Sequence, residues 1–394
     1  MFSDSVMNWF FLTGEYPPEP GGVADHTAGL VQELAELALV PVVLSGGDAG
    51  LSVRNGTPVY RVGHAFAPVH LRYLAHALDS FPGPRVIFIQ YVPHAFGLRG
   101  MNLPLVLWLA WRACVRRDRL IVLFHEVAFP FQNGPIRHRV LAIVQQCMAS
   151  LMAAVAWRIL VTTTAWLPRL RCVSNRVVTS LPVFSNLPES VDAEVVRRCR
   201  IHWLQRTGAQ CLVGHFGTYG SGISNLLLAT IMQLSDKLAA TTAFLLMGRG
   251  AAAWLQQASS ALAERAACCH VVEDADRLAL ATTLAACDTA LQPYPDGITT
   301  RRTTAMSAMS LGVPLVSNDG PLTDPCWRTD LPCARLAAKP NGAALATSLA
   351  EVLQLPLAER VDAGAHGRAW YTVHASRAHA AKVVKLIVEE CQHR

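Results

Sequence analysis

The sequence predicts an α/β protein with two domains of similar size. Short apolar runs alternate with longer segments of helical periodicity, and the alternation stops at a proline-bracketed polar stretch and then starts again. Hydrophobic residues make up 52% of the 394 residues and charged residues only 16%. Strand–helix–strand alternation implies parallel sheets with right-handed crossovers, and strands buried on both faces account for the apolar composition. The length fits roughly two to three domains of about 150 residues each.

Six apolar runs in the first half have the length of strands. Helical segments separate them, notably 137–156 and 25–37, where Leu30, Leu34 and Leu37 recur at helical spacing. The expected strands are 6–12, 40–45, 86–90, 120–124, 158–162 and 176–179.

A polar segment between Pro182 and Pro188 is typical of a linker, and the strand–helix pattern restarts after it. We therefore expect an N-terminal domain over 1–184, a C-terminal domain over 185–374, and a last helix within 375–394 that packs back toward the N-terminal domain. Two such domains enclose a cleft, with ligands at the carboxyl ends of the strands. The later strands are expected at 210–214, 243–247, 270–272, 289–292 and 313–316, and helices at 223–239, 252–266 and 375–391.

Composition and charge narrow the function classes. The net charge of +6 gives weak support for an anionic ligand, and we expect no nucleic-acid partner. Eleven cysteines without a C-x-x-C pair indicate neither a zinc site nor a disulfide scaffold, and they fit a reducing cytosol. No basic segment precedes the first apolar run, so we expect a cytoplasmic protein without a secretory signal.

Two apolar segments have the composition of membrane spans. The first, 101–111, has only eleven residues, and the second, 140–161, is interrupted by Gln145, Gln146 and Arg158. A span needs about 20 mostly apolar residues. We therefore expect both segments to be buried helices.

Two adjacent glycines, Gly21 and Gly22, stand between a proline-rich loop and the first expected helix. Paired glycines allow backbone N–H groups to approach an anion, which the helix dipole also favours. A plain tight turn explains the same pair equally well.

The proline-rich loop and its glycine pair resemble the opening of the retaining nucleotide-sugar glycosyltransferases of the GT-B fold, the group 1 or family-4 class. Three further places extend the resemblance in order along nearly the whole chain: 89–97, the strand-tip residues 124–126, and 291–297 with the following 308–316. The resemblance implies two Rossmann-like domains with a cleft between them. It also implies transfer of a sugar from a nucleoside-diphosphate sugar with retention of anomeric configuration.

The sequence departs from this family at two places. The family's two glutamates correspond to Thr299 and Ser307 here, and Asp296, the only nearby acid, is out of register. The arginine and lysine that the family places after the first strand of its second domain are missing from 213–222. A non-catalytic relative that acts as a binding or assembly module is therefore the alternative hypothesis, and a GT-B sugar-nucleotide epimerase is a third.

Arg301 and Arg302 begin the helix that is expected to end at Gly312. Cations at a helix N-terminus oppose its dipole by roughly 0.3–1 kcal/mol each, unless an anion lies between them and the helix end. We infer that one or both replace the missing diphosphate clamp, with Arg249 as a second candidate. The alternative is an arginine pair on a solvated helix face.

His125 follows a central strand and is the main catalytic candidate. It could bind the sugar or handle the acceptor proton, with Glu126 orienting it or acting alone. A satisfied structural histidine is the alternative. Asp25 and His26 form a second acid–histidine pair, although Asp25 could simply cap the first helix.

The candidate residues fall into three groups, and none of them is a metal ligand. The catalytic candidates are His125, Glu126 and Asp296, and the acceptor-binding candidates are Asp25, His26 and Tyr91. The donor-binding candidates are Gly21, Gly22, Gly217, Thr218, Arg249, Tyr294, Gly297, Thr300, Arg301 and Arg302.

We expect no cofactor other than the nucleotide sugar as co-substrate. Arginines, loop amides and helix N-termini can stabilise the charge on a departing diphosphate without a metal. The one Asp-x-Asp spacing, Asp274 with Asp276, precedes a helix and is interpreted as helix capping.

The acceptor is open among a glycan, a lipid-linked sugar and a small molecule. Segment 99–120 carries five arginines against Asp118, with Trp108 and Trp111 among them. This pattern fits a membrane-surface patch at the inner face of the membrane. It also fits an amphipathic helix with a buried tryptophan face and a solvated basic face.

Overall fold

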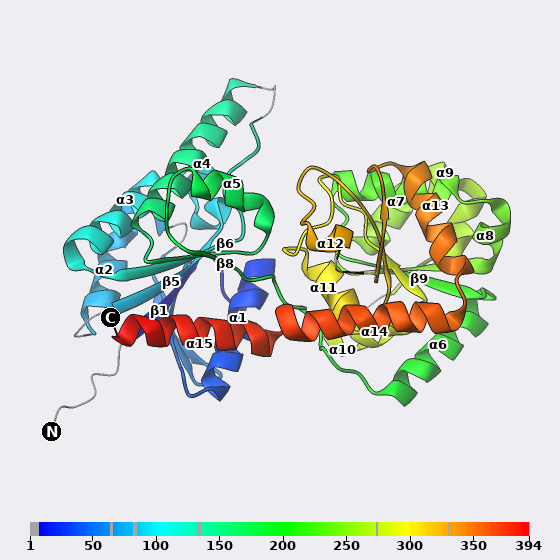
Figure 1. Ribbon diagram of the computed structural model, residues 1–394, viewed down its shortest axis with the longest axis horizontal. Helices are drawn as coiled ribbons and strands as arrows, with labels where there is room; N and C mark the ends of the chain where they lie inside the picture. The colour runs from blue at the N-terminus through cyan, green and yellow to red at the C-terminus, as the bar shows by residue number, and fades with distance from the viewer. Residues whose placement is uncertain are drawn as a thin grey trace. The chain divides into compact units, whose positions relative to one another are not determined.

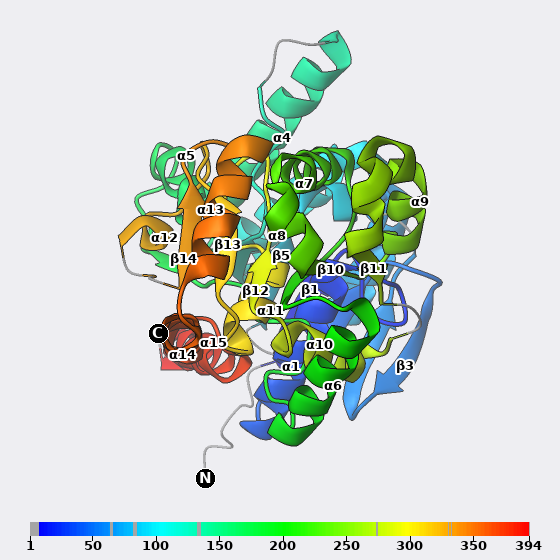
Figure 2. The same cartoon turned by 90° about the vertical axis from the view of Figure 1, so that its right-hand side faces the viewer.

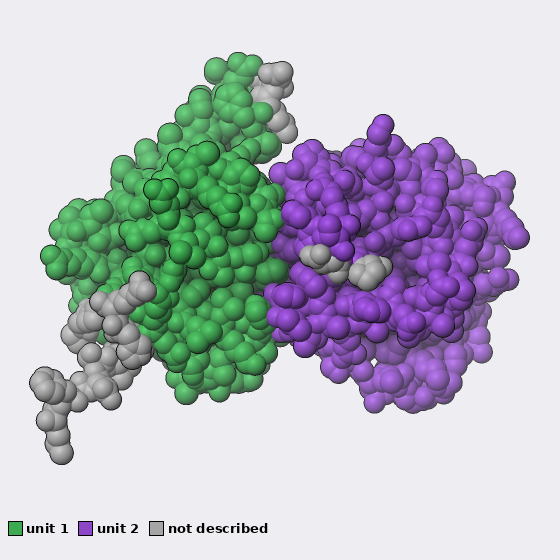
Figure 3. Space-filling view, in the orientation of Figure 1, with its two compact units in different colours: residues 1–182, 377–394 green, residues 183–376 purple. Residues whose placement is uncertain are grey.

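The computed structural model describes residues 8–63, 66–81, 85–131, 135–272, 275–329, 331 and 333–393. The chain forms two compact α/β units, as the sequence predicts. Unit 1 comprises Met1–Pro182 and Arg377–Arg394, and unit 2 comprises Val183–Ser376 (Figure 3).

The sheet of unit 1 has eight strands in the order β3-β4-β2-β1-β5-β6-β7-β8 (Figure 1). All neighbours are parallel except β3 and β4, which form an antiparallel hairpin at one edge. The central strands β1, β5 and β6 are almost wholly buried, whereas every residue of β3 is exposed. The strands are β1 (Asn8–Thr13), β2 (Val42–Ser45), β3 (Gly50–Arg54), β4 (Thr57–Arg61), β5 (Arg85–Tyr91), β6 (Arg119–Phe124), β7 (Arg158–Val161) and β8 (Val178–Ser180).

The last helix of the chain belongs to unit 1. It packs against α1, and Arg158 forms an ion pair with Glu390 while Arg119 donates a hydrogen bond to the carbonyl of Cys391. The helices of this unit are α1 (Gly22–Glu36), α2 (Leu71–Asp79), α3 (Leu103–Trp111), α4 (Ile136–Val155), α5 (Leu167–Arg171) and α15 (Arg377–His393), and a π turn, η5 (Arg112–Arg116), follows α3.

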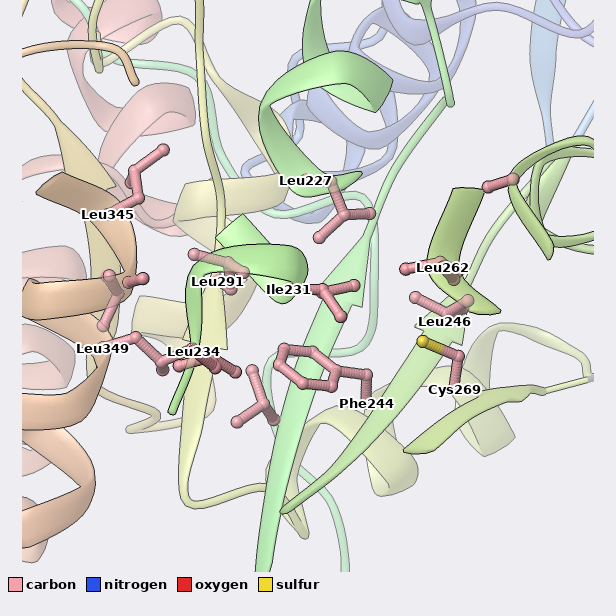
Figure 4. Packing of buried hydrophobic residues seen from close by; sticks show 14 of the residues in the cluster. Leu227, Ile231, Leu234, Phe244, Leu246, Leu262, Cys269, Leu291, Leu345 and Leu349 are labelled. Carbon is pink, nitrogen blue, oxygen red and sulfur yellow. The ribbon is translucent and has the colours of Figure 1, made fainter. Parts of the chain in front are cut away.

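The sheet of unit 2 is parallel throughout, in the order β11-β10-β9-β12-β13-β14. Side chains from β10, such as Phe244 and Leu246, meet Leu227 and Ile231 of α7 in its core (Figure 4). The strands are β9 (Cys211–Phe216), β10 (Thr242–Met247), β11 (Cys269–Val271), β12 (Thr289–Leu291), β13 (Leu315–Asn318) and β14 (Ala334–Ala337). The helices are α6 (Ala193–Thr207), α7 (Ser221–Gln233), α8 (Asp236–Thr241), α9 (Ala251–Leu262), α10 (Arg277–Ala285), α11 (Thr303–Ser310), α12 (Cys326–Thr329), α13 (Gly342–Gln354) and α14 (Leu357–His374).

Several predicted helices differ from the structure in length or in burial. Segment 223–239 is divided into α7 and α8, because Leu234 is extended and the Ser235 hydroxyl accepts a hydrogen bond from the Leu238 amide at the start of α8. The prediction that 101–111 and 140–161 are buried helices is wrong for their outer faces. Only 33% of the most apolar 18-residue window of α4 is buried, and the N-terminal half of this helix projects from unit 1 (Figures 1 and 2).

The strand orders locate where ligands are expected. In unit 2 the chain order reverses between β9 and β12, and in unit 1 it reverses between β1 and β5. The loops that leave the carboxyl ends of such strand pairs diverge to opposite faces, which leaves a crevice suited to ligands.

Candidate functional site

A cavity of about 190 Å³ lies at the strand-order reversal of unit 2. The loops after β9 and β12, the N-terminal turn of α7 and the N-terminus of α11 surround it. A larger cavity of about 500 Å³ lies where β13 and β14 begin, at the amino ends of the strands, and we assign it no role in this site. The smaller cavity is lined by His215, Phe216, Gly217, Thr218, Ile223, Gln292, Tyr294, Arg301, Arg302, Thr303 and Thr304.

Arg301 and Arg302 both line this cavity and are half-buried rather than exposed on a helix face. Arg302 is the N-cap residue of α11, and its guanidinium lies over the ring of Tyr294 at 4.6 Å. The Tyr294 hydroxyl lies 2.7 Å from the hydroxyl of Thr304 in the same helix. Two cations and a helix N-terminus therefore share one small cavity, which is an arrangement that an anion stabilises.

A buried carboxylate holds the loop that carries these arginines. Oδ2 of Asp324 accepts hydrogen bonds from the amide and the hydroxyl of Thr300, at 2.6 and 3.0 Å. Thr300 therefore positions the arginine loop, and its hydroxyl is directed to Asp324. Gly297, at φ +90°, is required by packing, since a Cβ there would lie 2.6 Å from the Gly320 amide nitrogen. No sequence pattern singled out Asp324.

His215, at the end of β9, is the cavity residue that sequence reasoning missed. Its side chain is buried, and Nδ1 lies 2.8 Å from the carbonyl oxygen of Leu291, so Nδ1 carries the proton. Nε2 has no hydrogen-bond partner among the described residues. Burial lowers the pKa of His215 to about 4. At neutral pH, Nε2 is thus a buried acceptor on a residue that lines the cavity. The sequence did contain a signal for it, because His215 lies near the end of an expected strand, as His125 does.

Of the four other candidates of unit 2, two line the cavity and two lie outside it. Gly217 and Thr218 line it, and Gly217 touches the next loop so closely that a Cβ on Gly248 would lie 2.3 Å from its carbonyl oxygen. Arg249, in that next loop, and Asp296 are exposed and do not line the cavity.

The two positions of the family glutamates are buried. Thr299 is fully buried. The hydroxyl of Ser307 lies 3.0 Å from that of Ser185 and 3.3 Å from Oδ1 of Asn186, in the segment that leads into unit 2. Ser307 therefore fixes this segment to α11.

In unit 1, two predicted histidines come together at the carboxyl edge of the sheet. The rings of His26, in α1, and His125, after β6, have centroids 5.0 Å apart and are nearly perpendicular. Nε2 of His125 lies 2.5 Å from Oε1 of Gln90. Burial, then His125 and Arg377, hold the pKa of His26 well below its ordinary value, so its ring is neutral at pH 7.

Tyr91 does not fit the predicted acceptor contact. Its side chain is fully buried, its ring packs 4.8 Å from that of Phe124 between centroids, and burial raises the pKa of its hydroxyl. Glu126 is half-buried and its amide donates to the carbonyl of Tyr91. Asp25 lies in the first turn of α1, but Gly21 is the N-cap residue, so Asp25 does not cap this helix.

The predicted anion site at Gly21 and Gly22 holds a carboxylate of the protein itself. Oε1 of Glu15 accepts a hydrogen bond from the Ala24 amide at 3.4 Å, and a Cβ on Gly21 would lie 2.0 Å from the same oxygen. Burial raises the pKa of Glu15, and the amides of Ala24 and Val23 oppose that shift. The glycine pair therefore accommodates Glu15, which argues against a donor diphosphate at this helix end.

In the part of the chain that the structure describes, no three His, Cys, Asp or Glu side chains cluster as metal ligands would. Asp276 caps α10 by accepting a hydrogen bond from the Ala279 amide at 2.8 Å. Asp274, the other member of the Asp-x-Asp spacing, lies outside the described residues.

Neither models of known families nor curated proteins match the sequence. Solved structures do match the fold over nearly the whole chain. Sucrose-phosphate synthase from Thermosynechococcus elongatus has a TM-score of 0.74 at 15% identity, covering 98% of this chain and 100% of its own. A UDP-forming α,α-trehalose-phosphate synthase from Burkholderia xenovorans, in complex with glucose-6-phosphate, has a TM-score of 0.70 at 13% identity, with coverage of 98% and 100%.

A third match is HepE from Anabaena in complex with UDP-glucose, with a TM-score of 0.69 at 12% identity and the same two coverages, 98% and 100%. The chain therefore has the GT-B fold that the sequence resemblance implied. At sequence identities this low, the similarity is one of fold.

Proposed function

We propose that the protein is a glycosyltransferase that moves a sugar from a nucleoside-diphosphate sugar to an acceptor. The observation that carries the proposal is the cavity of unit 2, where Arg301, Arg302 and the N-terminus of α11 converge at the strand-order reversal. This is the equipment that a departing diphosphate needs, because negative charge develops there as the glycosidic bond breaks. The three GT-B structures named above, all glycosyl-transfer synthases or sugar-nucleotide complexes by their descriptions, support the same class.

The donor in this proposal is a UDP-sugar. Two of the similar structures are described with UDP, one as UDP-forming and one bound to UDP-glucose. Nε2 of His215 accepts a hydrogen bond from a hydroxyl or N–H group of the bound donor. The acceptor remains open among a glycan, a lipid-linked sugar and a small molecule, and retention of configuration follows from the family resemblance.

In this proposal, arginines and backbone amides stabilise the negative charge of the departing diphosphate. A residue of unit 1 assists the transfer of the acceptor proton. We assign assistance with the acceptor proton to His125, which is held against Gln90 and lies beside the neutral His26. We include in the proposal that no metal is required and that the reaction takes place in the cytoplasm, where the eleven free cysteines stay reduced. Activity should then persist in EDTA.

The clamp is tested by substituting both arginines. Arg301→Ala with Arg302→Ala should weaken UDP binding, measured by calorimetry, at least tenfold, which is about 1.4 kcal/mol. Arg197→Ala with Arg198→Ala is the matched control, because these two arginines are also adjacent, lie in unit 2 and are exposed on α6. An unchanged UDP affinity in the folded clamp variant would remove the clamp from the proposal.

A non-catalytic binding module is the second candidate, and two observations favour it. The positions of both family glutamates are occupied by buried hydroxyl residues, and Glu15 fills the α1 N-terminus. Incubation of the protein with UDP-sugars and a panel of acceptors separates the hypotheses. UDP release with formation of a glycoside supports the enzyme, and the anomeric signal of the product reports retention. Tight UDP binding without any donor consumption supports the module.

A further inference from the structure

Two neighbouring helices of unit 1 present apolar side chains to solvent. On α4, Ile136 is 74% exposed and Val140 is 47% exposed, and Ile143 continues the stripe. On α3, Leu107 and Trp111 are exposed four residues apart. The two helices pack against each other. We call these exposed side chains, with Leu103 and Phe131, the α3–α4 surface.

The side chains of the α3–α4 surface do not contribute to the core of unit 1, because both helices pack against the unit through their other faces. Leu105 and Leu109 of α3 are buried, as are Met148 and Met152 of α4. A helix that covers a sheet in a water-soluble unit normally turns polar residues outward. An exposed apolar stripe on two adjacent helices therefore indicates a surface that is covered by something else.

The charged side chains of α3, η5 and α4 themselves are all basic. α3, η5 and α4 contain no Asp or Glu. Their exposed side chains that carry a charge at neutral pH are arginines, Arg116, Arg137 and Arg139, with Arg117 next in the chain. Arg116 lies 3.3 Å from Asp79 of α2, and Arg112, the remaining arginine, is buried against Asp118.

We infer that the α3–α4 surface binds the face of an anionic lipid bilayer. Apolar side chains enter the boundary between head groups and acyl chains, while arginines extend their charged ends to lipid phosphates. A tryptophan such as Trp111 favours the same depth. The arginines supply the charge complement that an anionic lipid surface requires.

α4 lies on the bilayer in this inference and does not cross it. Among the described residues it is the one helix that is long and apolar enough to cross a bilayer. Its inner face is committed to unit 1, because Gln145 accepts from the Phe129 amide at 2.7 Å and donates to the Gly100 carbonyl at 3.1 Å. As the crossover between β6 and β7, it cannot leave the sheet without unfolding the unit.

A second copy of the chain is a poorer occupant. A symmetric contact through the α3–α4 surface places the arginines of both copies in one interface, because the same patch of each copy takes part. No acid within α3, η5 or α4 offsets that repulsion. The lipid surface satisfies both the apolar and the basic part.

Flotation of the full-length protein with vesicles tests the inference without any sugar nucleotide, so its result is independent of the proposed function. We expect binding to phosphatidylglycerol–phosphatidylcholine vesicles that weakens as salt rises. Ile136→Gln with Val140→Gln should reduce this binding at least tenfold. The matched control is Leu357→Gln with Val361→Gln on α14, which have the same spacing and are 63% and 59% exposed; it should bind as the unaltered protein does.

The basic part is tested by Arg137→Gln with Arg139→Gln, which should abolish the preference for anionic over neutral vesicles. Circular dichroism checks that each variant is folded. The inference is overturned if the unaltered protein does not float, if the α4 variant floats as well as the control, or if neutral vesicles bind equally. It is also overturned if sedimentation shows a dimer that the α4 substitutions dissociate, since a second copy then covers the surface.

Discussion

His215 links the small cavity of unit 2 to the stability of this unit. Its pKa is about 4 in the folded protein against 6.5 in an exposed histidine. Below pH 6.5 the unfolded chain therefore takes up a proton that the folded unit does not. The free energy of unfolding should fall as pH is lowered from 6.5 toward 4, by up to about 3 kcal/mol from this residue.

The variant His215→Gln should therefore show a flatter decline of Tm between pH 7 and pH 4.5 than the unaltered protein. The folded pKa of His26 is lowered in the same direction, so part of the decline remains. His202→Gln, at an exposed position on α6, is the control. A pH profile of His215→Gln identical to that of the unaltered protein contradicts the assignment of a neutral, buried ring.

Asp324 is the residue on which the geometry of the arginine loop depends. Asp324→Asn replaces the carboxylate that receives two hydrogen bonds from Thr300, and hydrogen bonds to a charged group contribute about 1.5–3 kcal/mol. We expect lower stability by roughly that amount and weaker UDP binding. Asp319→Asn, which affects an ion pair with the partly exposed Arg328, should change stability little. Unchanged UDP affinity in Asp324→Asn would show that the loop does not depend on this anchor.

At the scale of elements, the α1 N-terminus allows a prediction about Glu15. Burial dominates the upward shift of its pKa, so the ionised form is less favourable in the folded protein than in the unfolded chain. Glu15→Gln keeps an oxygen acceptor for the Ala24 amide and removes the buried charge. Its Tm at pH 7 should therefore equal or exceed that of the unaltered protein, whereas Glu36→Gln, at the exposed end of the same helix, should have no effect. A marked fall in the Tm of Glu15→Gln contradicts this account.

The strands show which elements could be predicted. Buried central strands such as β5 and β6 were predicted to within one residue at each end, because both faces are covered and the sequence is continuously apolar. β3, whose residues are all exposed, and the half-exposed β14 were missed, because edge strands carry no such run. α7 and α8 were merged, because only two extended residues, Leu234 and Ser235, interrupt an otherwise helical pattern.

At the scale of the molecule, α15 returns to complete unit 1. Val384 is fully buried on this helix, whereas Leu386, two residues on, is exposed. Val384→Asp should destabilise unit 1 by at least about 3 kcal/mol, because it buries an unpaired charge. Leu386→Asp should be near neutral. Calorimetry should resolve two transitions, of which only the one from unit 1 shifts. A shift of the unit 2 transition by Val384→Asp would be inconsistent with α15 belonging to unit 1.

The sequence by itself determined the class of fold and the place of Arg301 and Arg302, because both depend on local patterns: the alternation of buried strands with helices, and two cations at a helix start. It could not determine which buried groups face a cavity or fill one. His215 lines the cavity of unit 2 and Asp324 holds the loop beside it, in both cases through contacts between segments distant in sequence. Glu15 fills the predicted anion site through a contact with the Ala24 amide, which the sequence pattern of paired glycines did not indicate. The exposure of apolar side chains on the outer faces of α3 and α4 also depends on tertiary packing. The hydrophobicity of a residue does not by itself show whether its side chain is buried in the core or exposed to solvent.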